Sequence, residues 1–176
     1  MRFFKTLASI SVLAALAAGL ALYLYRPAGV EVRRVRFESI GGRQLVGDYY
    51  LPEKREGLLP AVLLCHGVEA NKEVMGHMGI EFARRGFAAL SFDYGGYGES
   101  DPHGDELSLM IEDTFSALRR LYLEPETRGE GSTALVGHSM GVTYAVGLAG
   151  MSPDSGSPGP DLDVEGPRDG LIRGHV

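Results

Sequence analysis

The sequence lacks most of the features that would assign it to a disulfide-rich, nucleic-acid-binding or metal-binding class. A single cysteine, Cys65, occurs among 176 residues, so no disulfide can form within the chain, and cysteine usage leaves the compartment open. The net charge is -6 and no large basic patch occurs, which argues against a nucleic-acid partner. No spacing typical of metal ligands is present, so we expect no metal and no cofactor.

A phosphate-binding glycine loop is also missing. The first apolar run that reads as a parallel strand is followed by HGVEANK, residues 66–72, where a dinucleotide-binding domain has G-x-G-x-x-G. A nucleotide-binding doubly wound domain is therefore disfavoured. The chain instead has 44% hydrophobic and 23% charged residues, which is ordinary for a globular protein, and enough length for one domain with a core.

The first 26 residues form a separate N-terminal segment. Residues 6–25 contain no charge and are flanked by Lys5 and Arg26. This run is long enough to cross a bilayer as a helix, and we predict a membrane anchor at residues 1–26. A cleaved signal segment of a secreted protein is the alternative, but the apolar run continues past its small-residue cleavage sites. Basic residues on both sides leave the side of the membrane open.

Residues 27–150 alternate between strand and helix patterns and predict an α/β fold. The expected elements are a β-hairpin at 32–38 and 44–51, strands at 61–65, 88–92 and 133–136, and helices at about 72–85, from 105 and after 139. Asn71 and Asp105 are the expected N-caps of the first two helices. Because strands and helices alternate after the hairpin, we expect a mostly parallel sheet with helices on both faces.

The most informative stretch is LVGHSMG, residues 135–141, with Ser139 at its centre. It reads as a strand, a sharp turn and a helix. Gly137 and Gly141 suit this turn, because a Cβ two residues before or after the serine would collide with a neighbouring strand or helix. The helix N-terminus then offers unpaired N–H groups to an oxyanion. The alternative is an ordinary serine in a chain with 25 glycines.

The chain from about Arg33 to Gly150 resembles the α/β-hydrolase superfamily, in particular its serine-peptidase, esterase and acyl-hydrolase-like members. Four motifs account for the resemblance by their order and spacing: SIGGRQLVGDYYLP as the entry hairpin, LLCHG, SFDYGGYGESD, and LVGHSMG as the nucleophile elbow. The resemblance implies a hydrolase that cleaves an ester, thioester or amide of a small-molecule or peptide acyl substrate.

By that resemblance Ser139 is the nucleophile, and the backbone N–H groups of Val68 and Met140 form the oxyanion hole. The other residues of these motifs are implied to be structural. They are His66, Gly67, Asp93, Gly137, His138 and Gly141. Asp93 and Ser100 are expected to stabilise the glycine-rich loop that follows residue 93 through side-chain to backbone hydrogen bonds. A contact between His66 and substrate is the alternative to its structural role.

The triad acid and base are the point where the chain departs from this superfamily. Both normally follow the serine, the acid before the histidine. Here residues 151–176 are rich in proline, glycine and aspartate and predict a disordered tail, which cannot hold His175 in place as a base. We therefore expect an incomplete domain at 27–150, truncated after the elbow helix, with an exposed apolar edge at the elbow strand. The alternative function is a non-catalytic, membrane-tethered binding module.

Overall fold

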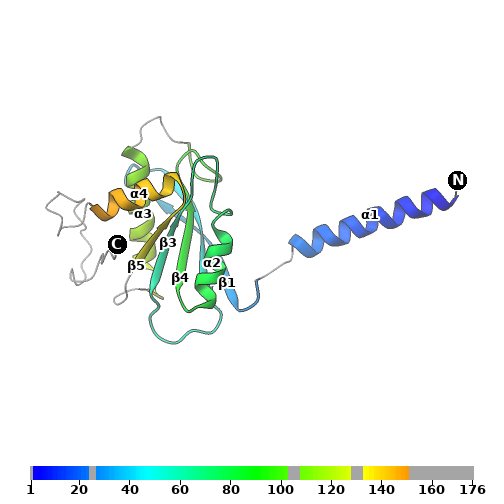
Figure 1. The fold of residues 1–176 in the computed structure, drawn as a ribbon, viewed down its shortest axis with the longest axis horizontal. Helices are drawn as coiled ribbons and strands as arrows, with labels where there is room; N and C mark the ends of the chain where they lie inside the picture. Colours follow the sequence, from blue (N-terminus) through cyan, green and yellow to red (C-terminus); the bar gives the residue numbers. More distant parts are fainter. Residues whose placement is uncertain (1, 24–26, 103–107, 128–132, 151–176) are drawn as a thin grey trace.

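The computed structural model of the chain describes residues 2–23, 27–102, 108–127 and 133–150. Four helices and five strands are found among these residues (Figure 1). In chain order they are α1 (Arg2–Tyr23), β1 (Val30–Glu38), β2 (Gln44–Pro52), β3 (Ala61–Cys65), α2 (Gly76–Arg84), β4 (Ala88–Asp93), α3 (Ser108–Leu123), β5 (Thr133–Gly137) and α4 (Met140–Gly150). The predicted tail, 151–176, lies outside the described residues.

The five strands form one sheet in the order β1-β2-β4-β3-β5. Strands β1 and β2 pair antiparallel as a hairpin, and its turn is closed by a hydrogen bond from Ser39 N–H to the Arg43 carbonyl at 2.8 Å. Strand β2 is antiparallel to β4, whereas β4, β3 and β5 run parallel. The predicted α/β class, with an N-terminal hairpin joined to a parallel sheet, is confirmed.

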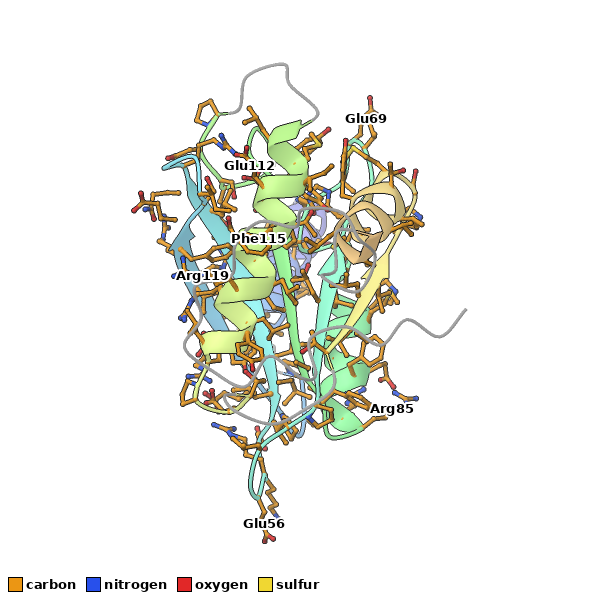
Figure 2. All side chains as sticks on the ribbon, turned by 90° about the vertical axis from the view of Figure 1, so that its left-hand side faces the viewer. Glu56, Glu69, Arg85, Glu112, Phe115 and Arg119 are labelled. Atoms are coloured by element: carbon orange, nitrogen blue, oxygen red, sulfur yellow. The ribbon has the colours of Figure 1, made fainter. Side chains whose placement is uncertain are left out.

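Helices cover both faces of this sheet, as Figures 1 and 2 show. Helix α2 packs on one face, and α3 and α4 pack on the other. Strand β3 lies between the two layers, and its residues alternate between the two cores: Val62 and Leu64 face α2, while Leu63 and Cys65 face α3 and α4. All five residues of β3 are buried. Burial of a leucine side chain, such as that of Leu63 or Leu64, contributes about 1.5 to 3 kcal/mol of transfer free energy.

The start of helix α2 differs from the prediction. We expected a helix from about Lys72 with Asn71 as its N-cap, but residues 72–75 form turns, and α2 begins at Gly76 with no side-chain cap. The physical reason is that tertiary hydrogen bonds to β4 hold the backbone of Lys72 outside the helix. The backbone N–H of Lys72 donates to Asp93 Oδ1 at 2.7 Å, and the hydroxyl of Ser91 donates to the Lys72 carbonyl at 2.9 Å. The cap expected at Asp105 lies outside the described residues.

The predicted membrane contact through residues 6–25 is not supported. Helix α1 (Arg2–Tyr23) overlaps this segment over residues 6–23. In the part of the chain that the structure describes, no helix has the length and hydropathy needed to cross a bilayer.

Candidate active site

Ser139 stands between the end of β5 and the start of α4, with its residue exposed to solvent. Its backbone φ is 52°, in the left-handed region that residues other than glycine adopt infrequently. Such a conformation costs about 1 to 3 kcal/mol and persists only where the surroundings enforce it. The serine is therefore held in a strained turn directly before a helix.

Two glycines allow this turn, because neither position has room for a side chain. A Cβ on Gly137 would lie 2.5 Å from the backbone nitrogen of Val142, and a Cβ on Gly141 would collide with the carbonyl of Cys65. The Cys65 carbonyl also accepts a hydrogen bond from His138 N–H at 3.0 Å. The end of β3 thus fixes the elbow through backbone contacts, with buried Cys65 directly beneath it.

The loop after β3 lies against the elbow. A Cβ on Gly67 would stand 3.1 Å from the Ser139 Cβ and 3.1 Å from the His138 carbonyl oxygen, so the two backbones are in close contact. Val68 follows Gly67 and is 58% exposed, and Glu69 has a left-handed φ of 56°. Figure 2 shows Glu69 at the end of the sheet opposite Glu56.

Met140 is the first residue of α4, so its N–H belongs to the helix N-terminus, where intrahelical acceptors are missing. The exposed residue Ser139 is therefore bordered by the N-terminus of α4 and by the loop that contains Val68. This arrangement suits attack on a carbonyl group whose oxygen becomes negative, because N–H groups and the helix dipole stabilise negative charge.

His66 is a buried loop-shaping residue. It is 0% exposed, and its Nδ1 lies 2.8 Å from the Gly67 carbonyl while Tyr94 N–H donates to its Nε2 at 3.3 Å. Since a carbonyl can only accept and an N–H can only donate, Nδ1 has the proton and the ring is neutral. Burial holds the pKa of His66 below its ordinary value. Both ring nitrogens are bonded to backbone groups, which leaves neither facing a substrate.

Asp93 is fully buried at the end of β4 and binds three donors. Its carboxylate accepts hydrogen bonds from Lys72 N–H, from Lys72 Nζ at 2.7 Å and from Glu99 N–H at 3.0 Å. The Ser100 hydroxyl donates to the Asp93 carbonyl at 2.7 Å. A Cβ on Gly98, whose φ is 51°, would collide with the carboxylate. The glycine-rich loop after β4 is therefore wrapped around Asp93.

Lys72 is a residue that sequence reasoning missed. A lysine in a polar loop after Asn71 is typical of a solvated side chain, but here it is 0% exposed. Its Nζ lies 2.7 Å from Asp93 Oδ2, 2.9 Å from Glu99 Oε1 and 3.0 Å from Glu73 Oε1. Burial alone would lower the pKa of Lys72, but its bonds to these carboxylates outweigh burial and raise it. The lysine is thus a buried, charged group.

Groups for acid–base or metal chemistry are sparse beside Ser139. Residues 140–150 contain no aspartate, glutamate or histidine, and His138 is exposed next to the serine. Within the described ranges, no group of three or more His, Cys, Asp or Glu side chains could hold a metal ion.

Comparison with protein families gives one match that covers more than half of the chain. Residues 59–158 match the family described as serine aminopeptidase, S33. Two uncharacterized proteins of Mycobacterium tuberculosis, from strains CDC 1551 and H37Rv, are each 32% identical over 127 residues. That alignment is 72% of this chain and 43% of each relative, so the chain spans less than half of their length.

Solved structures with the same fold include both an unassigned protein and esterases. A hypothetical protein from Pseudomonas aeruginosa is 28% identical with a TM-score of 0.62 and is matched over 76% of this chain and 42% of its own. An acetyl xylan esterase from Paenibacillus sp. R4 is 22% identical with a TM-score of 0.63, over 72% and 47%. An esterase from Pyrococcus furiosus is 21% identical with a TM-score of 0.58, over 73% and 51%.

Proposed function

The chain belongs to the serine aminopeptidase S33 family of α/β-hydrolases, and from that premise we propose that it is a serine hydrolase with Ser139 as its nucleophile. The resemblance noted in the sequence is thereby confirmed at the level of family and fold. The hydrolytic reaction is part of the proposal. The proposed substrate is an ester, thioester or amide of a small molecule or peptide.

The observation that supports this proposal most directly is the conformation of Ser139. Its φ of 52° is strained, and only glycine fits two residues before and two residues after it, at positions 137 and 141. A chain has no general reason to keep an exposed serine in such a turn before a helix. The turn does have a chemical use, because it presents an exposed serine directly before a helix N-terminus, next to the N–H of Met140.

In the proposed mechanism the Ser139 oxygen attacks the carbonyl carbon of the substrate and its proton passes to a base. The carbonyl oxygen becomes negative and accepts hydrogen bonds from the N–H groups of Met140 and Val68. The leaving group then departs with a proton from the same base, and water hydrolyses the acyl-enzyme. The proposal leaves the acid and the base unassigned, because residues 140–150 contain no aspartate, glutamate or histidine.

The test is covalent labelling of the full chain with a fluorophosphonate probe, followed by mass spectrometry of the adduct. We expect the adduct on Ser139 and none in Ser139→Ala. Thr143→Ala is the matched control, because Thr143 is an exposed residue with a hydroxyl on α4, the helix that follows Ser139. Absence of label on a folded wild-type protein would contradict the proposed nucleophile.

A second candidate function is a non-catalytic binding module with the same fold. It is favoured by two observations: both ring nitrogens of buried His66 are bonded to backbone groups, and no histidine follows Ser139 within the described residues. Hydrolysis of a short-chain p-nitrophenyl ester distinguishes the two candidates. A rate that Ser139→Ala abolishes excludes the binding module, whereas equal rates for the two proteins favour it.

A further inference from the structure

We infer that Lys72 is a positioning residue that fixes the Val68 amide beside Ser139, by anchoring the far end of the loop that contains Val68. This inference rests on the proposed function, because it assigns a use to the Val68 N–H in the same site. Lys72 itself is fully buried and acts through the loop.

The near end of the loop is anchored at His66. The ring donates from Nδ1 to the Gly67 carbonyl at 2.8 Å and accepts from Tyr94 N–H at 3.3 Å. Tyr94 and Tyr97 flank the ring, with centroid distances of 4.9 and 5.2 Å. This end is therefore held by neutral groups against the residue that follows β4.

The far end of the loop is anchored at Lys72, through both its backbone and its side chain. Asp93 accepts from the Lys72 N–H and from Nζ, both at 2.7 Å, and the Ser91 hydroxyl donates to the Lys72 carbonyl at 2.9 Å. Ser91 and Asp93 are fully buried residues of β4. Both ends of the loop are thus tied to residues 91–94, at the end of β4 and directly after it.

Only five residues, 67–71, lie between these two anchors, so the backbone of this loop has little conformational freedom. Gly67 is in contact with the elbow and Glu69 is in the left-handed region, which leaves the Val68 N–H with few alternative positions. A shift at Lys72 must therefore be taken up within the segment that contains Val68.

A buried ion pair is a poor means of gaining stability alone, since desolvation of both charges opposes the attraction between them. A buried pair can however fix a single geometry, because each partner is costly to leave unpaired. Lys72 meets this description: its Nζ is bonded to Asp93, Glu99 and Glu73, and its backbone is bonded through the same Asp93. The charge holds the loop closed at this anchor.

The experiment compares the full wild-type chain with Lys72→Met, which keeps side-chain length and removes the charge. Arg120→Met is the matched control, because it removes a charged partner from nearly buried Glu124, which follows α3. Two quantities are measured: the rate of fluorophosphonate labelling of Ser139, separated into probe binding and chemical step, and hydrogen exchange of residues 66–75.

In Lys72→Met we expect the chemical step to slow by about tenfold to a hundredfold with little change in probe binding, because a misplaced donor affects the transition state most. We expect exchange of residues 66–75 to accelerate by about tenfold or more, since their anchor is lost. Arg120→Met should change neither quantity. A folded Lys72→Met protein with wild-type labelling and wild-type exchange would overturn the inference.

Ser91→Ala provides a second, milder variant in case Lys72→Met does not fold. It removes one hydroxyl that holds the Lys72 carbonyl and leaves the charges in place. We expect a severalfold slower chemical step and faster exchange in the same segment, and no change in either would again overturn the inference. If the wild-type protein is not labelled at Ser139, the proposed function fails. Exchange of residues 66–75 then still decides whether Lys72 holds the loop.

Discussion

Strands β4 and β5 flank the same neighbour, β3, but are buried very differently. All six residues of β4 are buried, whereas Ala134 of β5 is exposed and the other four residues of that strand are only partly covered. Leu63 of β3 makes the contrast direct, since it pairs with fully buried Leu90 on one side and with half-buried Leu135 on the other. Ser139 follows the less buried strand.

The contrast shows that two kinds of constraint form this site. On the β4 side, a network of buried charges and hydrogen bonds around Asp93 fixes the loops. On the β5 side, where burial is incomplete, close contacts at Gly137 and Gly141 fix the elbow without any side chain. Loss of a side chain should therefore be costly at β4, and gain of one should be costly at the elbow.

The largest expected effect comes from Asp93→Ala, which removes the carboxylate that pairs with buried Lys72. Breaking a buried ion pair on one side costs about 3 to 5 kcal/mol of unfolding free energy. The control Asp101→Ala removes an exposed carboxylate that accepts from Gln44 N–H, and should cost about 1 kcal/mol or less. Urea unfolding measures both, and equal losses would show that the network does not hold the β4 side.

The next largest effect is expected when either of the two leucines that pair with Leu63 of β3 is truncated. Leu90→Ala should lower the unfolding free energy by about 2 to 5 kcal/mol, because it leaves a cavity in a closed core. Leu135→Ala should cost about 1 kcal/mol, because part of that side chain is already in water. Chemical denaturation of both variants tests the contrast between the strands. A larger loss for Leu135→Ala would reverse it.

A smaller effect is expected when a methyl group is added at the elbow. Gly141→Ala places a Cβ against the Cys65 carbonyl and should destabilise the fold by about 1 to 3 kcal/mol. Gly147→Ala on the same helix meets only the Ile111 Cδ1 at 3.7 Å, so we expect a gain of up to about 1 kcal/mol. Thermal unfolding compares the two. If both alanines stabilise the protein, steric fixation of the elbow is wrong.

The smallest effect is a pH dependence that originates at His66. Burial holds its pKa below the ordinary value of 6.5. Below that pH the unfolded chain binds a proton that the folded protein does not, so stability is complete above pH 6.5 and is lost as the pH falls, by at most about 1.4 kcal/mol per pH unit. Urea midpoints at about pH 7.5 and about pH 5.5 should differ less in His66→Asn than in wild type. An unchanged difference would assign the pH dependence to other groups.

The succession of strands and helices along the chain and the turn at Ser139 could be predicted because local patterns specify them. Short apolar runs ended by His66 and Asp93 correspond to β3 and β4, and glycines on either side of Ser139 correspond to a turn with no room for side chains. Close contacts between backbone segments can be predicted from the sequence at such positions, since glycine is the only residue that allows them.

The buried network could not be predicted because its members are distant in sequence and ordinary in type. Lys72 reads as a solvated lysine until Asp93 and Glu99 are folded around it. The same contacts delay the start of α2 to Gly76, against a local pattern that favours a helix from residue 72. Tertiary hydrogen bonds to a carboxylate overrode local helix propensity at that point.

The burial of Cys65, the last residue of β3, can be used to follow opening of the protein. Cys65 is the only thiol in the chain, it is 0% exposed, and burial raises its pKa to about 12. A thiol of this kind is a poor target for alkylating reagents while the sheet is closed, because the thiolate is the reactive form. The rate at which iodoacetamide alkylates Cys65 therefore reports how often the sheet opens at β3, the strand whose end contacts the Ser139 turn.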